Sequence, residues 1–167
     1  ANYSVLATGN TTAHISARPL TIDFTGVDKV YDGLLGASVT TATPVANGYV
    51  SGDVFSINRT ATFVDKNVGT PVGINVTAVS LSGTDAANYS VASTGSTSAN
   101  ITPKTLSAAL VGNIQKTYDG NTNATLTGAN YDLAGFVTVA GVTEGAAVTQ
   151  TLGSYNSRNV VEANSVT

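Results

Sequence analysis

Two five-residue words in this chain combine side chains that could do chemistry. Lys29-Val30-Tyr31-Asp32-Gly33 returns as Lys116-Thr117-Tyr118-Asp119-Gly120, so the pattern K-x-Y-D-G occurs twice. A lysine, a phenol and a carboxylate this close together could bind a ligand or an ion at a turn. They match no motif of catalysis or cofactor binding. The sequence therefore predicts no catalytic, cofactor-binding or metal-ligating residue, and no enzyme.

The same residues also suit a purely structural role, which we favour. Asp-Gly forms turns readily, because glycine accepts positive φ and the aspartate can bond the backbone two residues on. The tyrosine before it could bury its ring, and the lysine could pack its stem on the same strand face. We assign this structural motif to Lys29, Tyr31, Asp32, Gly33, Lys66, Asn67, Lys116, Tyr118, Asp119 and Gly120.

The composition excludes several classes of protein. Only 10% of the 167 residues are charged, the net charge is −3, and the seven lysines and arginines are scattered. A nucleic-acid binder would show a basic patch, so no nucleic-acid partner is expected. No apolar run of eighteen or more residues is present, so no membrane insertion is expected. Without cysteine, neither a disulfide nor a thiolate metal site can form.

The remaining polar residues give no constellation of a known site. His14 is the only histidine, and Asn100 stands at its matching position. The aspartates do not form the loop motif of a calcium-binding hand, although calcium held between separate loops stays open. Glu144 and Glu162 occur in one copy of the repeat alone, which argues against a pair of catalytic carboxylates.

The chain is built from tandem copies of one module. Residues 1–5 match residues 87–91, and the match continues through Ile15 and Ile101 to the K-x-Y-D-G words. We predict that residues 1–17 are the C-terminal strands of a preceding repeat, 18–103 a complete repeat and 104–167 an incomplete one. Pro19 and Pro103 stiffen the short joints. Such joints between equal modules predict a rod.

Period-two patterns predict an all-β fold. The predicted strands begin with an alternation of Leu20, Ile22 and Phe24. A phase slip at residues 78–79 predicts a bulge or a change of sheet, and a hairpin is expected around Gly95. Within the complete repeat, at most one helical turn is expected, at residues 85–88. The favoured architecture is a row of small Ig-like β-sandwich modules, with mostly-β grasp-like modules as the alternative.

Four ordered motifs resemble the YDG repeat. They are the K-x-Y-D-G words, the stretch at residues 65–69, the stretch at residues 81–89, and Ile101-Thr102-Pro103-Lys104. The last copy departs from the pattern, since Asn156-Ser157-Arg158-Asn159 stands in place of residues 64–67. That repeat occurs in large surface adhesins and filamentous-haemagglutinin-like exoproteins of Gram-negative bacteria. The resemblance implies an extracellular, cell-surface or secreted location, with a role in cell adhesion or biofilm.

Three functional hypotheses follow. The first is a structural stalk or filament repeat that spaces or assembles a surface fibre, with neighbouring repeats as its partners. The second is a module that binds host or matrix glycans, for which Tyr49 and Tyr131 are the aromatic platforms. The third is a fibre subunit whose open module is completed by strands of another chain, by strand addition. The sequence implies no cofactor.

Overall fold

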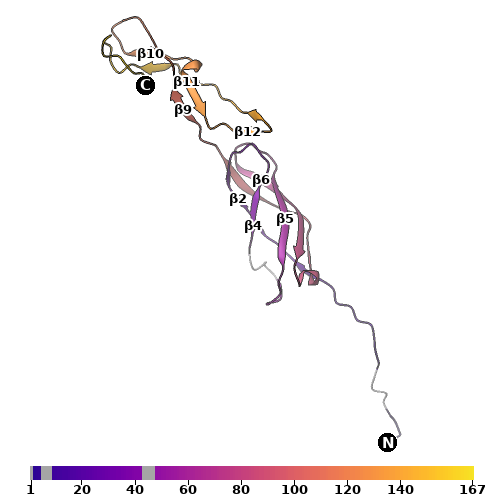
Figure 1. Cartoon of the computed structure of the whole chain (residues 1–167). Helices are drawn as coiled ribbons and strands as arrows, with labels where there is room; N and C mark the ends of the chain where they lie inside the picture. Colours follow the sequence, from indigo (N-terminus) through magenta and orange to yellow (C-terminus); the bar gives the residue numbers. More distant parts are fainter. Residues whose placement is uncertain (1, 5–8, 43–47) are drawn as a thin grey trace. The chain divides into compact units, whose positions relative to one another are not determined.

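The computed structural model describes residues 2–4, 9–42 and 48–167 (Figure 1). Strands dominate, and the only helices among these residues are two single turns, so the all-β prediction is confirmed. The elements are β1 (Arg18–Leu20), β2 (Phe24–Val27), β3 (Lys29–Val30), β4 (Ser38–Thr41), β5 (Ser56–Phe63), β6 (Gly69–Ser82), η1 (Ala86–Asn88), β7 (Tyr89–Val91), β8 (Gly95–Thr102), β9 (Ser107–Leu110), β10 (Asn123–Thr125), η2 (Gly128–Asn130), β11 (Tyr131–Ala134), β12 (Thr138–Val139), β13 (Val142–Thr143) and β14 (Leu152–Ser154).

The chain forms two compact units. The first contains Ala1–Lys29, Leu35–Asp65 and Gly69–Asn100. The second contains Ile101–Thr167 together with two loops from the earlier repeat, Val30–Leu34 and Lys66–Val68. The loop that carries the first K-x-Y-D-G word therefore belongs to the second unit, whereas Lys29 belongs to the first.

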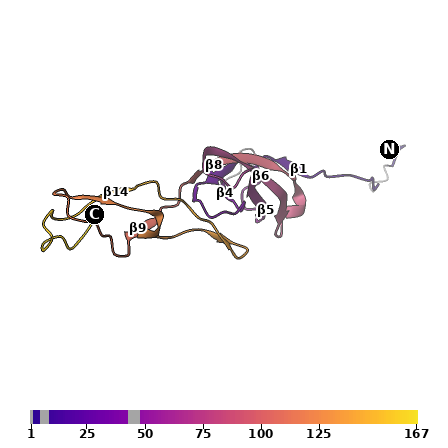
Figure 2. The same ribbon diagram turned by 90° about the horizontal axis from the view of Figure 1, so that it is seen from above.

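The main sheet holds four strands in the order β3-β8-β6-β5 and curls as a half-barrel (Figure 2). Its buried face carries alternating apolar residues, as expected for a sheet with one face on the core. Ile74 on β6 is 1% exposed, and Val76 on β6 and Ile101 on β8 are fully buried. Phe63 at the end of β5 is 2% exposed. These side chains form the apolar core under the sheet.

The predicted bulge is confirmed on β6. The pairing of β5 with β6 shifts between Asn58↔Ser80 and Thr60↔Thr77, so Ala78 and Val79 together lie opposite Arg59. Ala78 adopts a φ of 51°, which an alanine rarely takes and a bulge can impose. The shift lets Val79 be buried after Val76, and it explains why the apolar phase changes along this strand.

The predicted hairpin around Gly95 is wrong. β7 pairs with β1 in parallel, through Arg18↔Tyr89, whereas β8 lies in the four-stranded sheet. The chain crosses between the two sheets at residues 92–94, where the Val79 amide donates to the Ser93 carbonyl at 3.0 Å. Sequence spacing favoured a local pairing, but the buried faces of β7 and β8 cover different parts of the core. The helical turn expected at residues 85–88 is confirmed as η1.

The second unit contains three two-stranded sheets, β9-β11, β10-β14 and β12-β13. Apart from Ile101 on β8, its buried hydrophobic residues are Ala124, Leu126 and Val137, each at most 8% exposed. Several of its strand residues stay open to solvent, including Leu110 at 38% and Leu152 at 69%.

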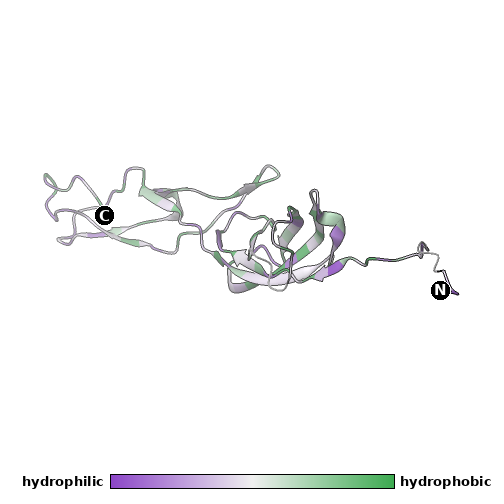
Figure 3. Cartoon of the chain, turned by 90° about the horizontal axis from the view of Figure 1, so that it is seen from below, coloured by the Kyte–Doolittle hydropathy of each residue, from purple (hydrophilic) through white to green (hydrophobic). Residues whose placement is uncertain are grey.

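Apolar and polar positions alternate along the strands of the first unit (Figure 3). Residues 9–17 form no strand and are exposed throughout, and Ile15 is 95% exposed. Ala1, Val5 and Thr8 of the predicted repeat match lie outside the described residues. In the part of the chain that the structure covers, no helix has the length and apolar character needed to span a membrane.

Candidate functional site

The first K-x-Y-D-G word forms a tight turn held by its aspartate. The Leu34 amide donates to Asp32 Oδ1 at 2.9 Å, two residues on from the aspartate. Gly33 has a φ of 74°, in the left-handed region that glycine enters without strain. A Cβ at this position would press on Val139 of the second unit. The turn therefore depends on both the carboxylate and the glycine.

The second word repeats this geometry. The Asn121 amide donates to Asp119 Oδ1 at 3.2 Å, again two residues on, and Gly120 has a φ of 77°. Asn121 extends the turn, because its Oδ1 accepts from the Asn123 amide at 2.9 Å. Both words are thus turns whose aspartate satisfies a backbone amide, in the manner of an Asx turn.

The lysine of each word lies over an aromatic ring far along the chain. Lys29 Nζ is 5.2 Å from the ring centroid of Phe63, and Lys116 Nζ is 5.5 Å from that of Tyr155. Each ammonium also donates to a backbone carbonyl of its own turn, that of Gly36 at 3.1 Å or that of Asn121 at 2.8 Å. The positive charge faces the negative π surface of the ring. Each lysine thus links its own word to an aromatic residue far along the chain.

The tyrosines of the two words differ in how much of their side chain is exposed, and neither ring is fully buried. Tyr31 is only half-buried, and its hydroxyl donates to Glu144 Oε1 at 2.5 Å. Tyr118 is 63% exposed in this structure. The difference arises because Glu144, Phe136 and Val68 line a hollow together with Tyr31.

The Tyr31 contact predicts a pH dependence at high pH. The bond to Glu144 is the main cause that raises the pKa of the Tyr31 phenol. A phenol whose folded pKa lies above the unfolded value of about 10 contributes fully below that value and loses its contribution as the pH rises through the folded pKa. We therefore expect Tyr31→Phe to flatten the fall in stability of the second unit between pH 9 and 12.

The measurement is urea unfolding at a series of alkaline pH values. Tyr118→Phe is the matched control, because this ring stands at the same place in the second word and is mostly exposed. The control should keep the slope of the wild type. Identical slopes for wild type and Tyr31→Phe would contradict the contact.

Asp119 predicts the opposite behaviour at low pH. The hydrogen bond from Lys116 Nζ at 2.8 Å is the main cause that lowers the pKa of the Asp119 carboxyl, followed by the Asn121 amide. Its contribution to stability is therefore present above the unfolded pKa of about 3.9 and is lost as the pH falls through the lowered value. We expect Asp119→Asn to be less stable than wild type at pH 6 and equally stable near pH 2.

Asp132→Asn is the control for this experiment, since Asp132 is an exposed aspartate on β11 of the same unit. It should behave as the wild type at both pH values in chemical denaturation. A gap between Asp119→Asn and wild type that persists at pH 2 would show that the effect does not come from the charge.

Lys66 and Asn67 lie exposed in the Lys66–Val68 loop, which belongs to the second unit with the first word's turn. In the last copy, Asn159 lies in a small polar cluster. Its side chain donates to Glu162 Oε2 at 2.9 Å, and Ser157 Oγ donates to the same oxygen. These bonds, from Asn159 first and Ser157 second, lower the pKa of Glu162. The cluster closes a turn through the Ala163 amide and the Asn159 carbonyl.

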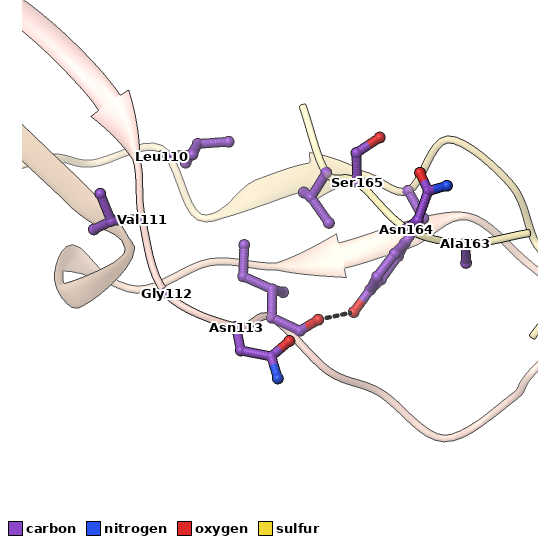
Figure 4. Close-up of a pocket in the computed structure, with 10 residues that line it drawn as sticks. Leu110, Val111, Gly112, Asn113, Ala163, Asn164 and Ser165 are labelled. Carbon is purple, nitrogen blue, oxygen red and sulfur yellow. Dashed lines mark hydrogen bonds between the residues drawn. The ribbon is translucent and has the colours of Figure 1, made fainter.

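A groove lies beside Tyr155 in the second unit (Figure 4). Residues 110–113 form one side and residues 163–165 the other. The Tyr155 hydroxyl crosses the floor and donates to the Ile114 carbonyl at 2.9 Å. We call this the Tyr155 groove. Its lining includes asparagine amides and small apolar side chains.

The other candidate residues are not gathered into one site. His14 is exposed in the segment before β1. Tyr49 is 38% exposed and packs edge-to-face on Phe55, and the Tyr131 hydroxyl donates to the Gln150 carbonyl at 3.1 Å. Among the described residues, no group of three or more acidic or histidine side chains could hold a metal ion.

Sequence reasoning missed three residues that the words depend on. Phe63 and Tyr155 receive the lysines, and Glu144 receives Tyr31. The first two carried a signal, because they match in the repeat and are both aromatic. Glu144 carried none, since its contact spans 113 positions and its residue occurs in one copy alone.

Comparison with known proteins agrees with the repeated geometry. The family model of the YDG domain matches the chain twice, over residues 16–98 and 102–167. No curated protein and no solved structure matches the chain. The two matches together cover most of the sequence, and each includes one word with its turn, its lysine and the aromatic ring beneath it. The chain belongs to the YDG domain family.

Proposed function

We propose that the chain is a structural repeat segment of an extracellular bacterial adhesin, in which tandem YDG domains form a stalk or filament for attachment or biofilm. The observation that carries this proposal is the shared use of the K-x-Y-D-G residues. In both copies the lysine lies over an aromatic ring and the aspartate closes its own turn. A stalk made of equal modules needs the same stabilising side chains in each module, and the K-x-Y-D-G residues meet that requirement.

The composition supports the same role. A chain with 10% charged residues and no cysteine relies on strand pairing and apolar packing to hold its modules. Export as an unfolded chain is easier without crosslinks. A sandwich-like packing of each complete module, with two sheets facing each other across the core, remains part of the proposal.

Small-angle X-ray scattering of the chain in solution tests the spacer role. A stalk segment should give a maximum dimension well above that of a compact sphere of the same mass. A compact particle would contradict the proposal. Screening the same sample against glycans and matrix proteins is the second arm, because saturable binding abolished by Tyr49→Ala or Tyr131→Ala would replace the spacer with a binding module.

A further inference from the structure

The β12–β13 hairpin of the second unit is too small to be stable by itself. β12 and β13 pair with each other in a sheet of two strands, joined by Ala140 and Gly141, whose φ values are 53° and 82°. Positive φ at both central residues is typical of a two-residue hairpin turn. The Glu144 amide closes the open end by donating to the Val137 carbonyl at 3.0 Å. Because an isolated two-stranded hairpin is at best marginally stable in water, packing must hold this one in place.

The turn of the first word packs directly against this hairpin. A Cβ on Gly33 would lie 2.8 Å from Val139 Cγ2 and 3.1 Å from Val137 Cγ1, both closer than carbon atoms normally approach. Gly33 is buried although it stands in a turn, and Val137 is only 8% exposed. Glycine allows other residues to approach its backbone closely. The missing side chain of Gly33 therefore makes room for the two valines.

Tyr31 adds a polar contact to the apolar one. Its hydroxyl donates to Glu144 Oε1 at 2.5 Å, and the amide of the same glutamate closes the hairpin. A hydrogen bond to an ionised carboxylate is about twice as strong as one between neutral groups. The Tyr31 amide also donates to the Thr102 carbonyl at 2.9 Å, which fixes the backbone at the start of the turn. The turn therefore contacts the hairpin through the side chain of Tyr31 and the backbone of Gly33.

The residues of the first word divide between two roles. Lys29 and Asp32 contact an aromatic ring and a backbone amide of their own copy of the repeat. Tyr31 and Gly33 instead contact the hairpin, which belongs to the second family match, at residues 102–167. The loop that carries these two residues and the hairpin lie in the same compact unit. The first pair thus shapes the turn, and the second pair faces the repeat that follows.

We propose that Tyr31 and Gly33 form a docking surface for the hairpin of the following YDG repeat. The partner is a two-stranded β-hairpin that presents a branched apolar side chain to the glycine, as Val139 does, and a carboxylate to the tyrosine, as Glu144 does. The word thus stabilises part of the repeat that comes after it, in addition to its own turn. This inference rests on the proposed role as a tandem structural repeat and names the contact through which one repeat supports the next.

The first test is hydrogen exchange of the Glu144 amide in the intact chain, compared for Gly33→Ala and Gly120→Ala. The two glycines have φ values of 74° and 77°, so alanine strains both turns alike. A Cβ on Gly120 would meet nothing within 4 Å. We expect Gly33→Ala to lower the protection of this amide about tenfold more than Gly120→Ala does, because only the methyl group at position 33 pushes the hairpin away.

The second test makes space for the added methyl group. Val139→Ala removes the carbon that a Cβ on Gly33 would meet first. In the wild type this substitution should lower the protection of the Glu144 amide, because it removes an apolar contact. In the Gly33→Ala background it should lower the protection by a smaller factor, since residues in contact do not act additively. The Gly120→Ala background is the control and should give the wild-type effect.

The polar contact is tested separately with Tyr31→Phe, which keeps the ring and removes the hydroxyl. This variant adds no strain to the turn, so circular dichroism should show unchanged folding. We expect it to lower the protection of the Glu144 amide about fivefold. In the Glu144→Ala background, where the acceptor is absent, it should have no effect. Tyr118→Phe is the matched control and should leave the protection unchanged in both backgrounds.

Equal effects of Gly33→Ala and Gly120→Ala would overturn the docking surface, as would additive effects of Gly33→Ala and Val139→Ala. If Gly33→Ala prevents folding, the double-mutant cycle of Tyr31 and Glu144 decides the question, and an effect of Tyr31→Phe that persists without the Glu144 side chain would overturn the proposal. Each of these results leaves the spacer role standing, because that role is tested by the dimension of the particle and by ligand binding. A compact, glycan-binding particle that keeps the coupling between Tyr31 and Glu144 would instead remove the spacer role and keep the docking surface.

Discussion

Phe63→Ala should be among the most destabilising single substitutions in the first unit, with a loss of about 3–5 kcal/mol in its free energy of unfolding. Phe63 is 2% exposed at the end of β5, where it pairs with Ile74 and its amide donates to the Leu35 carbonyl at 2.8 Å. Removing the ring leaves a cavity in the sheet floor. It also removes the π surface under Lys29, so the turn of the first word loses its attachment.

The measurement is chemical denaturation followed by hydrogen exchange at the amides of β5 and β6. Val64→Ala is the matched control, because Val64 is the next residue along the chain and is 60% exposed. Its effect should stay within about 0.5 kcal/mol. A loss below about 1 kcal/mol for Phe63→Ala would mean that the ring is not part of a packed floor.

Ile101→Ala should cost about 2–5 kcal/mol, since Ile101 is fully buried on β8 between two other strands of the main sheet. The repeat supplies a control of the same residue type in the same local sequence. Ile15 stands at the matching position and is 95% exposed. At concentrations where the chain is monomeric, Ile15→Ala should change stability by no more than about 0.5 kcal/mol.

The readout for this pair is the urea midpoint for unfolding of the four-stranded sheet that contains β8. If Ile15→Ala and Ile101→Ala lowered it equally, residues 9–17 would be packed into a unit rather than exposed.

Much of the strand pattern could be predicted from the sequence. The apolar face of β6 from Val72 to Val76 and the slip at Ala78 both follow from period two, because each strand residue faces either the core or solvent. Leu20 and Phe24 show where this reasoning fails. Their alternation predicted one strand, but β1 ends at Leu20 and pairs with β7, whereas β2 begins at Phe24 and pairs with β4. An alternating pattern predicts which side chains of a strand face the core, but it does not predict which strand pairs with it.

In the candidate site, too, contacts between sequence neighbours could be predicted, whereas contacts between distant residues could not. The turns at Asp32 and Asp119 depend on residues two apart, so their chemistry can be worked out from neighbours alone. The lysine contacts depend on rings more than thirty residues away, and the Tyr31 contact depends on Glu144 in the next repeat. Such contacts require the tertiary fold. The exposure of Tyr118 could not be predicted either, because it reflects what lies beside the turn rather than the turn itself.

The central claim is that the K-x-Y-D-G word holds each module together and does not bind a ligand. Its most direct test is the stability of each unit in Lys29→Met and Lys116→Met, which keep the side-chain stem but remove the charge over Phe63 or Tyr155. We predict that each substitution lowers the unfolding midpoint of the unit that carries it and leaves any binding to glycans or matrix proteins unchanged. Unchanged midpoints together with a loss of binding would contradict it.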